Sequence, residues 1–223
     1  MRVMVAIPAY SGQIHLGTMR SLFTDLQTLA ARGDQWRVHD ECGNALIADA
    51  RAQIVAEFLA SEFDQLIFVD SDVCWEAGAL VRLVDHPVDM VAGIYPQRKD
   101  PVAYCVSWKG AGELWADPDT GLLEVAGVPF GFVKLTRDML LKMREQYTDT
   151  EFYCETAPDK TAWALFCDYR IGRHKMGEDY AFCRRWVDMG GKVWVDPEIS
   201  MGHVGYKTFN GHLGRWLQSR GDA

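Results

Sequence analysis

The sequence predicts an α/β protein built around a doubly wound, mostly parallel sheet. Through the first 100 residues, short apolar runs alternate with segments whose apolar residues recur at helical spacing. The run Leu66–Val69 is apolar without alternation, which is typical of a central parallel strand buried on both faces. The chain has 223 residues and is 48% hydrophobic, so it can bury a substantial core in one large domain.

Strands and helices alternate along the first half of the chain. The first strand is a short apolar run that Pro8 ends. The second helix is expected because its apolar residues return at every third or fourth position. We expect strands at Arg2–Ile7, Gln35–Asp40 and Met90–Tyr95 and a further strand within Gln65–Asp72, and helices at Ile14–Ala31, Ala45–Ala60 and Ala77–Val84.

The pattern changes after Tyr95. Short strand candidates around the turn signal Asp117–Gly121 indicate a small antiparallel insert. Residues 151–169 are expected to be irregular, and Gly190 with Gly191 ends the last predicted helix. We expect strands at Val102–Trp108, Glu113–Trp115, Leu122–Ala126, Phe132–Leu135 and Lys192–Val195, and helices at Arg137–Gln146 and Glu178–Met189.

Charge and cysteine usage narrow the class of protein. The net charge of −8 argues against stable, broad nucleic-acid binding, which requires a basic surface. None of the six cysteines forms a CxxC pair, which fits reduced cysteines in the cytoplasm. The apolar N-terminal stretch is too short for a signal peptide, and no apolar run approaches the roughly 20 residues of a membrane span. We therefore expect a cytoplasmic protein without a transmembrane segment.

The sequence Asp70-Ser71-Asp72 follows the buried strand directly. In an extended chain, residues i and i+2 point the same way, so both carboxylates are expected to face one point beyond the strand. Ligands of open α/β sheets bind at that edge. Two hard oxygen ligands suit Mg²⁺ or Mn²⁺ between the protein and a substrate diphosphate. The alternative is a capping aspartate in an ordinary turn.

A second carboxylate pair begins the helix predicted after Gly177. Asp179 falls near the middle of the apolar stripe of that helix, and Glu178 lies at its edge. Asp179 is therefore expected to face inward, as a general base or as a ligand of an acceptor hydroxyl. The alternative is a carboxylate that only stabilises the helix dipole.

Two further side chains are candidates for the same site. His203 lies between glycines that permit close backbone approach, and with Asp70 and Asp72 it would make a mixed nitrogen and oxygen site suited to Mn²⁺. Arg51 lies beside the apolar face of its helix, where it either forms a salt bridge or directs its guanidinium at a diphosphate.

Taken together, these motifs resemble a glycosyltransferase of GT-A fold, of the family-2-like type found in bacteria and phages. The resemblance covers nearly the whole chain, with Leu66–Asp72 in the place of the DxD motif. The other matching segments are Val5–Tyr10, Asn44–Arg51, Val91–Pro96, Gly127–Leu135, Gly177–Cys183 and Gly202–Gly205.

The resemblance implies a role for each segment. Residues 1–100 would form the nucleotide-sugar-binding half and residues 101–223 the acceptor-binding half of one catalytic domain. Phe130 and Gly131 would shape the sugar pocket, and Asp179, with Glu178 beside it, would be the catalytic base. The donor-binding residues would be Pro8, Ala9, Tyr10, Arg51, Asp70, Ser71 and Gly131, and the metal ligands Asp70, Asp72 and His203.

The implied activity is the Mn²⁺- or Mg²⁺-dependent transfer of one sugar, favouring a UDP-sugar, to a hydroxyl acceptor. A glycan, a small molecule and a hydroxymethylated base of phage DNA are all candidate acceptors, and inversion and retention stay open. One rival is a sugar-1-phosphate nucleotidyltransferase, which would need a glycine-rich basic loop. Residues 8–13 have one glycine and no lysine or arginine. The other rival is a non-catalytic nucleotide-sugar-binding protein.

Overall fold

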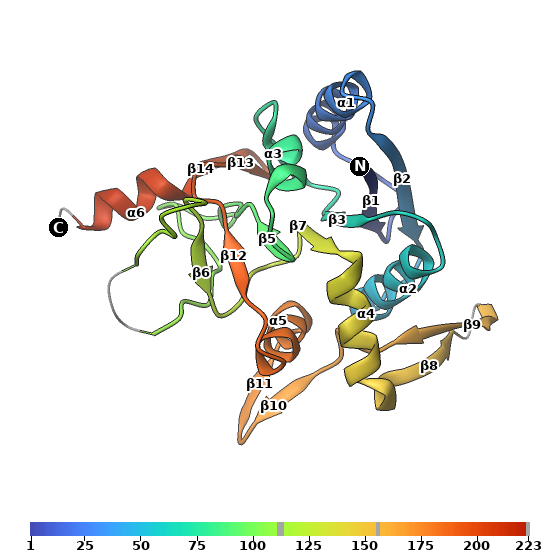
Figure 1. Cartoon of the computed structure of the whole chain (residues 1–223). Helices are drawn as coiled ribbons and strands as arrows, with labels where there is room; N and C mark the ends of the chain where they lie inside the picture. The colour runs from blue at the N-terminus through green and yellow to red at the C-terminus, as the bar shows by residue number, and fades with distance from the viewer. Residues whose placement is uncertain (111–113, 155–156, 222–223) are drawn as a thin grey trace.

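A mixed, mostly parallel seven-stranded sheet forms the centre of the computed structural model, which describes residues 1–110, 114–154 and 157–221. Five strands point one way, and only β7 and β6 are antiparallel to their neighbours. Figure 1 shows the sheet between its helices. The order is β2 (Gln35–Cys42), β1 (Arg2–Ala9), β3 (Gln65–Val69), β7 (Phe132–Thr136), β5 (Met90–Ala92), β12 (Val193–Val195) and β6 (Leu123–Val125).

Helices cover both faces of this sheet, as the alternating pattern predicts. Along β1, Val3 and Val5 pack against α1 and α3, whereas Met4 and Ala6 pack against α2, α4 and α5. This alternation of side chains makes three layers. The helices are α1 (Leu16–Ala31), α2 (Ile47–Leu59), α3 (Ala79–Asp85), α4 (Arg137–Gln146), α5 (Glu178–Asp188) and α6 (Leu213–Gly221), with a 3₁₀ turn at Thr148–Thr150.

Three smaller sheets were not expected. The first joins β4 (Val73–Trp75) to the hairpin of β13 (Ser200–Val204) and β14 (Thr208–His212), so that the residues directly after Asp72 pair with β13. The others are the hairpins β8 (Glu151–Cys154) with β9 (Ala157–Trp163), and β10 (Tyr169–Ile171) with β11 (His174–Met176).

Several expectations for the second half are wrong. Within the range 151–169, which was expected to be irregular, the described segments Glu151–Cys154 and Ala157–Trp163 are strands. The expected strand Val102–Trp108 does not form. Only two isolated bridges lie in it, between Tyr104 and Pro96 and between Ser107 and Gly127, and neither partner belongs to a strand. In the expected strand Glu113–Trp115, Glu113 lies outside the described residues, and Trp115 is 79% exposed and outside any strand. The antiparallel insert is therefore mostly loop.

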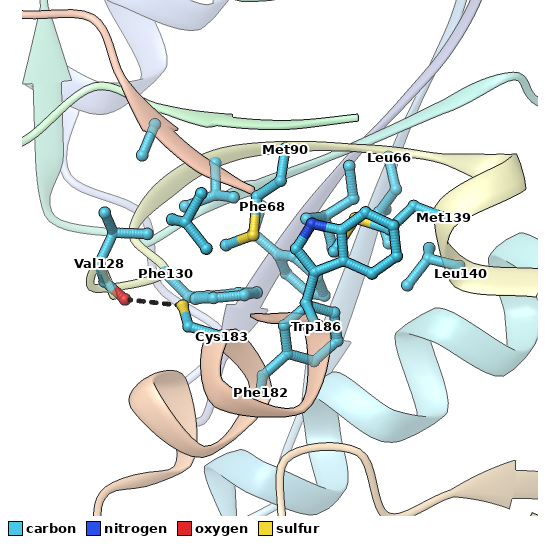
Figure 2. Close-up of a cluster of buried hydrophobic side chains, with 14 of the residues drawn as sticks. Leu66, Phe68, Met90, Val128, Phe130, Met139, Leu140, Phe182, Cys183 and Trp186 are labelled. Atoms are coloured by element: carbon cyan, nitrogen blue, oxygen red, sulfur yellow. Dashed lines mark hydrogen bonds between the residues drawn. The ribbon is translucent and has the colours of Figure 1, made fainter. Parts of the chain in front are cut away.

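An aromatic core joins the elements that carry the candidate site. Phe68 of β3, Phe130 before β7 and Phe182 of α5 are fully buried. The Phe130 ring lies 5.8 Å from that of Phe68 and 5.0 Å from that of Phe182, and Figure 2 shows these side chains together. This packing fixes the end of β3 and the start of α5 relative to each other. Among the described residues, no helix is both long and apolar enough to cross a membrane.

Candidate functional site

The Asp70–Asp72 segment is a turn, not the end of a strand. Strand β3 stops at Val69, so the extended geometry that would aim both carboxylates at one point does not apply. The carbonyl of Ser71 accepts hydrogen bonds from the His15 backbone N–H at 2.8 Å and the Thr18 hydroxyl at 3.1 Å. The turn is thereby fastened to the start of α1, and its two aspartates meet different partners.

Asp70 faces the inner part of the site. Its Oδ1 lies 3.5 Å from Nη2 of Arg51, and its Oδ2 accepts a hydrogen bond from the Tyr95 hydroxyl at 3.4 Å. Burial raises the pKa of Asp70, and the charge of Arg51 opposes that rise. Both oxygens of Asp70 have protein partners here, and its role as a metal ligand stays a prediction.

Gly131 is expected to shape a sugar pocket, and in the structure two protein side chains lie close to its Cα. A Cβ on Gly131 would lie 2.6 Å from Oδ2 of Asp70 and 2.5 Å from Cε1 of Tyr95. No side chain fits there without moving one of them. Phe130, expected to shape a sugar pocket, instead has its ring in the core, and its backbone N–H lies at the site.

Asp72 faces His203 across 3.7 Å, between Oδ1 and Nε2. The other ring nitrogen, Nδ1, lies 2.9 Å from the Pro96 carbonyl oxygen, which can only accept, so Nδ1 carries the proton. Burial lowers the pKa of His203 and favours its neutral form. Nε2 therefore presents a lone pair to a carboxylate oxygen. Such a pair of facing acceptors suits a bound cation.

The described side chains do not form a complete metal site by themselves. Within residues 1–110, 114–154 and 157–221, no three His, Cys, Asp or Glu side chains converge as a preformed metal site. Asp72 and His203 could provide two ligands. Mg²⁺ and Mn²⁺ sites in nucleotide enzymes characteristically take further ligands from water and substrate phosphates, so two protein ligands fit such an ion.

Arg51 connects the two halves of the site. It is 3% exposed, and its Nη1 donates to Glu178 Oε1 at 3.1 Å and pairs with Asp179 Oδ1, while Nη2 faces Asp70. The structure therefore brings Arg51 to three carboxylates. Its predicted contact with the nucleotide stays a prediction.

Asp179 faces inward from the first turn of α5, as the helical pattern predicts. Its second oxygen, Oδ2, accepts the backbone N–H of Phe130 at 3.3 Å. Burial raises the pKa of Asp179 to about 7; Arg51 opposes this rise, and the nearby Glu178 adds to it. A carboxyl group with this pKa exchanges a proton close to neutral pH.

A cavity of about 780 Å³ opens beside the end of β2, and its lining includes Glu41, Asn44, Asp49, Gln53 and Tyr153. The predicted donor residues lie next to it rather than in its wall: Pro8 and Ala9 are buried, and Tyr10 is 68% exposed. The Tyr10 carbonyl accepts the N–H of Gly43, a lining residue, at 3.1 Å.

The sequence reasoning gave none of these lining residues a role, although Asn44 and Asp49 lie in the segment Asn44–Arg51 that carries the resemblance. Glu41 lies near the carboxyl end of β2, which is parallel to β1 and β3. Ligands of open α/β sheets bind at this edge, so the argument that selected Asp70 also applies to Glu41.

A second cavity, of about 420 Å³, lies at the start of α5. Gly177 lines it from the N-cap of α5 and Tyr180 from the first turn, His174 and Lys175 from β11, and Tyr104 from the loop after β5. The helix that starts here also carries Glu178 and Asp179.

Comparisons with known proteins identify the fold. No family model matches the chain, and no curated protein does. The crystal structure of A197 from STIV matches with a TM-score of 0.55 at 17% identity, over 92% of this chain and 86% of that one. This likeness shows a shared fold.

Two weaker likenesses involve transferases. A glycosyltransferase involved in the glycosylation of the major capsid of PBCV-1 matches with a TM-score of 0.34 at 10% identity, over 62% of each chain. The inositol-1-phosphate CTP transferase from T. maritima matches with a TM-score of 0.44 at 10% identity, over 90% of this chain and 88% of that one. Likenesses this weak do not define a reaction.

Proposed function

We propose that this chain is a metal-dependent glycosyltransferase of GT-A fold, which moves one sugar from a nucleotide-sugar donor, favouring a UDP-sugar, to an acceptor hydroxyl. One observation carries the proposal. Asp72 faces His203, and the buried Arg51 joins the neighbouring Asp70 to Asp179, beyond the carboxyl end of β3, the edge at which open α/β sheets bind ligands.

Asp72 and His203 are the residues that would hold the metal, with Asp70 as a third candidate. A bound Mn²⁺ or Mg²⁺ would supply Lewis-acid stabilisation of the departing nucleoside diphosphate. The His203 ring is already fixed for this task, because the Pro96 carbonyl holds Nδ1–H and leaves the Nε2 lone pair free to bind a cation.

Asp179 is the proposed base. Its pKa of about 7 leaves a large fraction of the carboxylate ready to accept the acceptor hydroxyl's proton at neutral pH. In a direct displacement, the acceptor oxygen bonds to the anomeric carbon as the bond to the diphosphate breaks, and the proton goes to Asp179. Arg51 and the Phe130 N–H hold the carboxylate in place throughout.

The two cavities suggest where the substrates bind. The 780 Å³ cavity offers hydrogen-bonding side chains and the Tyr153 ring, which suit a nucleoside. The 420 Å³ cavity at the start of α5 offers Tyr104 and Tyr180, whose rings suit a sugar face. Donor and acceptor would then approach the carboxylate cluster from opposite halves of the chain.

A release assay tests the proposal. The protein is incubated with a panel of nucleotide sugars and Mn²⁺, Mg²⁺ or chelator, and free nucleoside diphosphate is measured. We expect slow, metal-dependent release from one donor. A parallel arm with nucleoside triphosphates and sugar-1-phosphates measures pyrophosphate; release only in that arm would replace the proposal with a nucleotidyltransferase. Donor binding without turnover, even with a panel of glycan acceptors, would indicate a non-catalytic binding protein.

A further inference from the structure

We propose that Arg98 is a latch on the metal site. Its guanidinium occupies Asp72 in the metal-free protein, leaves when a divalent cation binds, and then binds the donor's diphosphate. This inference rests on the proposed function, because it assumes that Asp72 is a metal ligand. It adds a residue that neither the DxD turn nor the carboxylate cluster contains.

The contact that carries the inference lies on Asp72. Nη2 of Arg98 forms an ion pair with Oδ2 of Asp72, while Oδ1 faces the Nε2 lone pair of His203 at 3.7 Å. One oxygen of the proposed ligand thus already holds a cation, and that cation is a protein side chain. A metal that takes both Asp72 and His203 must compete with it.

The loop after β5 holds Arg98 in this position. The Pro96 carbonyl accepts the His203 Nδ1–H at 2.9 Å, and Asp100 pairs with Lys207 at 2.5 Å, so both ends of the loop are tied to β13 or the turn that follows it. A Cβ on Gly205 would lie 3.2 Å from Cδ of Arg98. A larger residue at position 205 would crowd the arginine stem.

The contact is also weak enough to exchange. The side chains of Arg98 and Asp72 are 42% and 39% exposed, and ion pairs between groups this exposed change an equilibrium by only about two- to fivefold. A divalent cation bound by Asp72, His203 and a diphosphate can displace such a partner. Once released, the planar guanidinium remains at the edge of the site and can bind phosphate oxygens in a bidentate manner.

Mn²⁺ titrations followed by electron paramagnetic resonance test the latch. The proteins are wild type, Arg98→Ala and the matched control Lys99→Ala. Lys99 is the adjacent exposed residue, so its removal takes one positive charge from the same loop without breaking the Asp72 contact. Without nucleotide, we expect Arg98→Ala to bind Mn²⁺ about two- to fivefold more tightly than Lys99→Ala. With saturating Mn²⁺, we expect Arg98→Ala to bind UDP more weakly than the control, as measured by calorimetry.

The outcomes separate the latch from the proposed function. If all three proteins bind Mn²⁺ equally, Arg98 does not compete with the metal and the latch is wrong, while the metal site survives. Tighter Mn²⁺ binding with unchanged UDP binding would overturn the second role of Arg98. If none of the proteins binds Mn²⁺ with or without UDP, the metal site itself is wrong, and the latch with it.

Discussion

Replacing Asp179 with asparagine is expected to stabilise the folded protein above neutral pH. Burial raises the pKa of Asp179 from 3.8 to about 7, so between these values the folded chain holds a proton that the unfolded chain has lost. Wild-type stability therefore falls as pH rises through this window, and the loss is complete above pH 7. Asparagine has nearly the same shape and cannot ionise, so the variant escapes this loss.

The magnitude follows from the width of the window. One pKa unit corresponds to about 1.4 kcal/mol, and the two pH units from 5 to 7 lie inside the window. The difference in unfolding free energy between variant and wild type is expected to grow by roughly 2 to 3 kcal/mol from pH 5 to pH 8. Loss of the attraction between Arg51 and the carboxylate is already contained in the shifted pKa.

Urea unfolding at pH 5, 6, 7 and 8 measures this difference. Asp149→Asn is the control, because Asp149 is an exposed carboxylate outside the Arg51 cluster. The free-energy curves of wild type and control are expected to stay parallel while that of Asp179→Asn diverges upward. If Asp179→Asn also runs parallel to wild type, the carboxyl group titrates normally, and its suitability as a base near neutral pH has no physical support.

Three further substitutions test separate parts of the structure. Gly131→Ala places a Cβ within 2.6 Å of Asp70 and is expected to lower the free energy of unfolding by about 1 to 3 kcal/mol. Gly177→Ala, with open space around it, is the control and is expected to lower it little. Equal melting temperatures of the two variants would refute the close packing at Gly131. Asp25→Ala removes the buried carboxylate that accepts hydrogen bonds from the Trp75 indole and from the backbone N–H groups of Gly78 and Leu80. We expect the free energy of unfolding, measured with urea, to fall by roughly 3 kcal/mol or more. A loss below about 1 kcal/mol would contradict this hydrogen-bond network. Asp72→Asn is expected to lose Mn²⁺ binding, measured by titration, at an unchanged melting temperature; wild-type affinity would remove Asp72 from the metal site.

Local signals in the sequence predicted the elements that local interactions determine. Helix α4 has the predicted bounds Arg137–Gln146, because Thr136 caps its first turn by accepting the Met139 N–H and an amphipathic stripe follows. The inward position of Asp179 follows from the same kind of helical periodicity.

Two of the misses come from contacts that are distant in sequence, and a third from a local rule. Strands β13 and β4 pair residues more than 120 positions apart, and no local pattern in the glycine-rich tail specifies that partner. Arg51 meets Glu178 and Asp179 across separations of 127 and 128 residues. The turn at Asp70–Asp72 misled the geometric argument, since the strand rule was extended past the residue where β3 ends.

The most direct test of the account is a crystal structure with Mn²⁺ and UDP, recorded near the manganese absorption edge. The account predicts an anomalous peak bonded to Asp72 and to Nε2 of His203, with diphosphate oxygens completing the coordination and Asp179 facing the space beyond the diphosphate. Bound UDP without a manganese peak at Asp72 and His203, or a peak elsewhere in the chain, would contradict the proposed site.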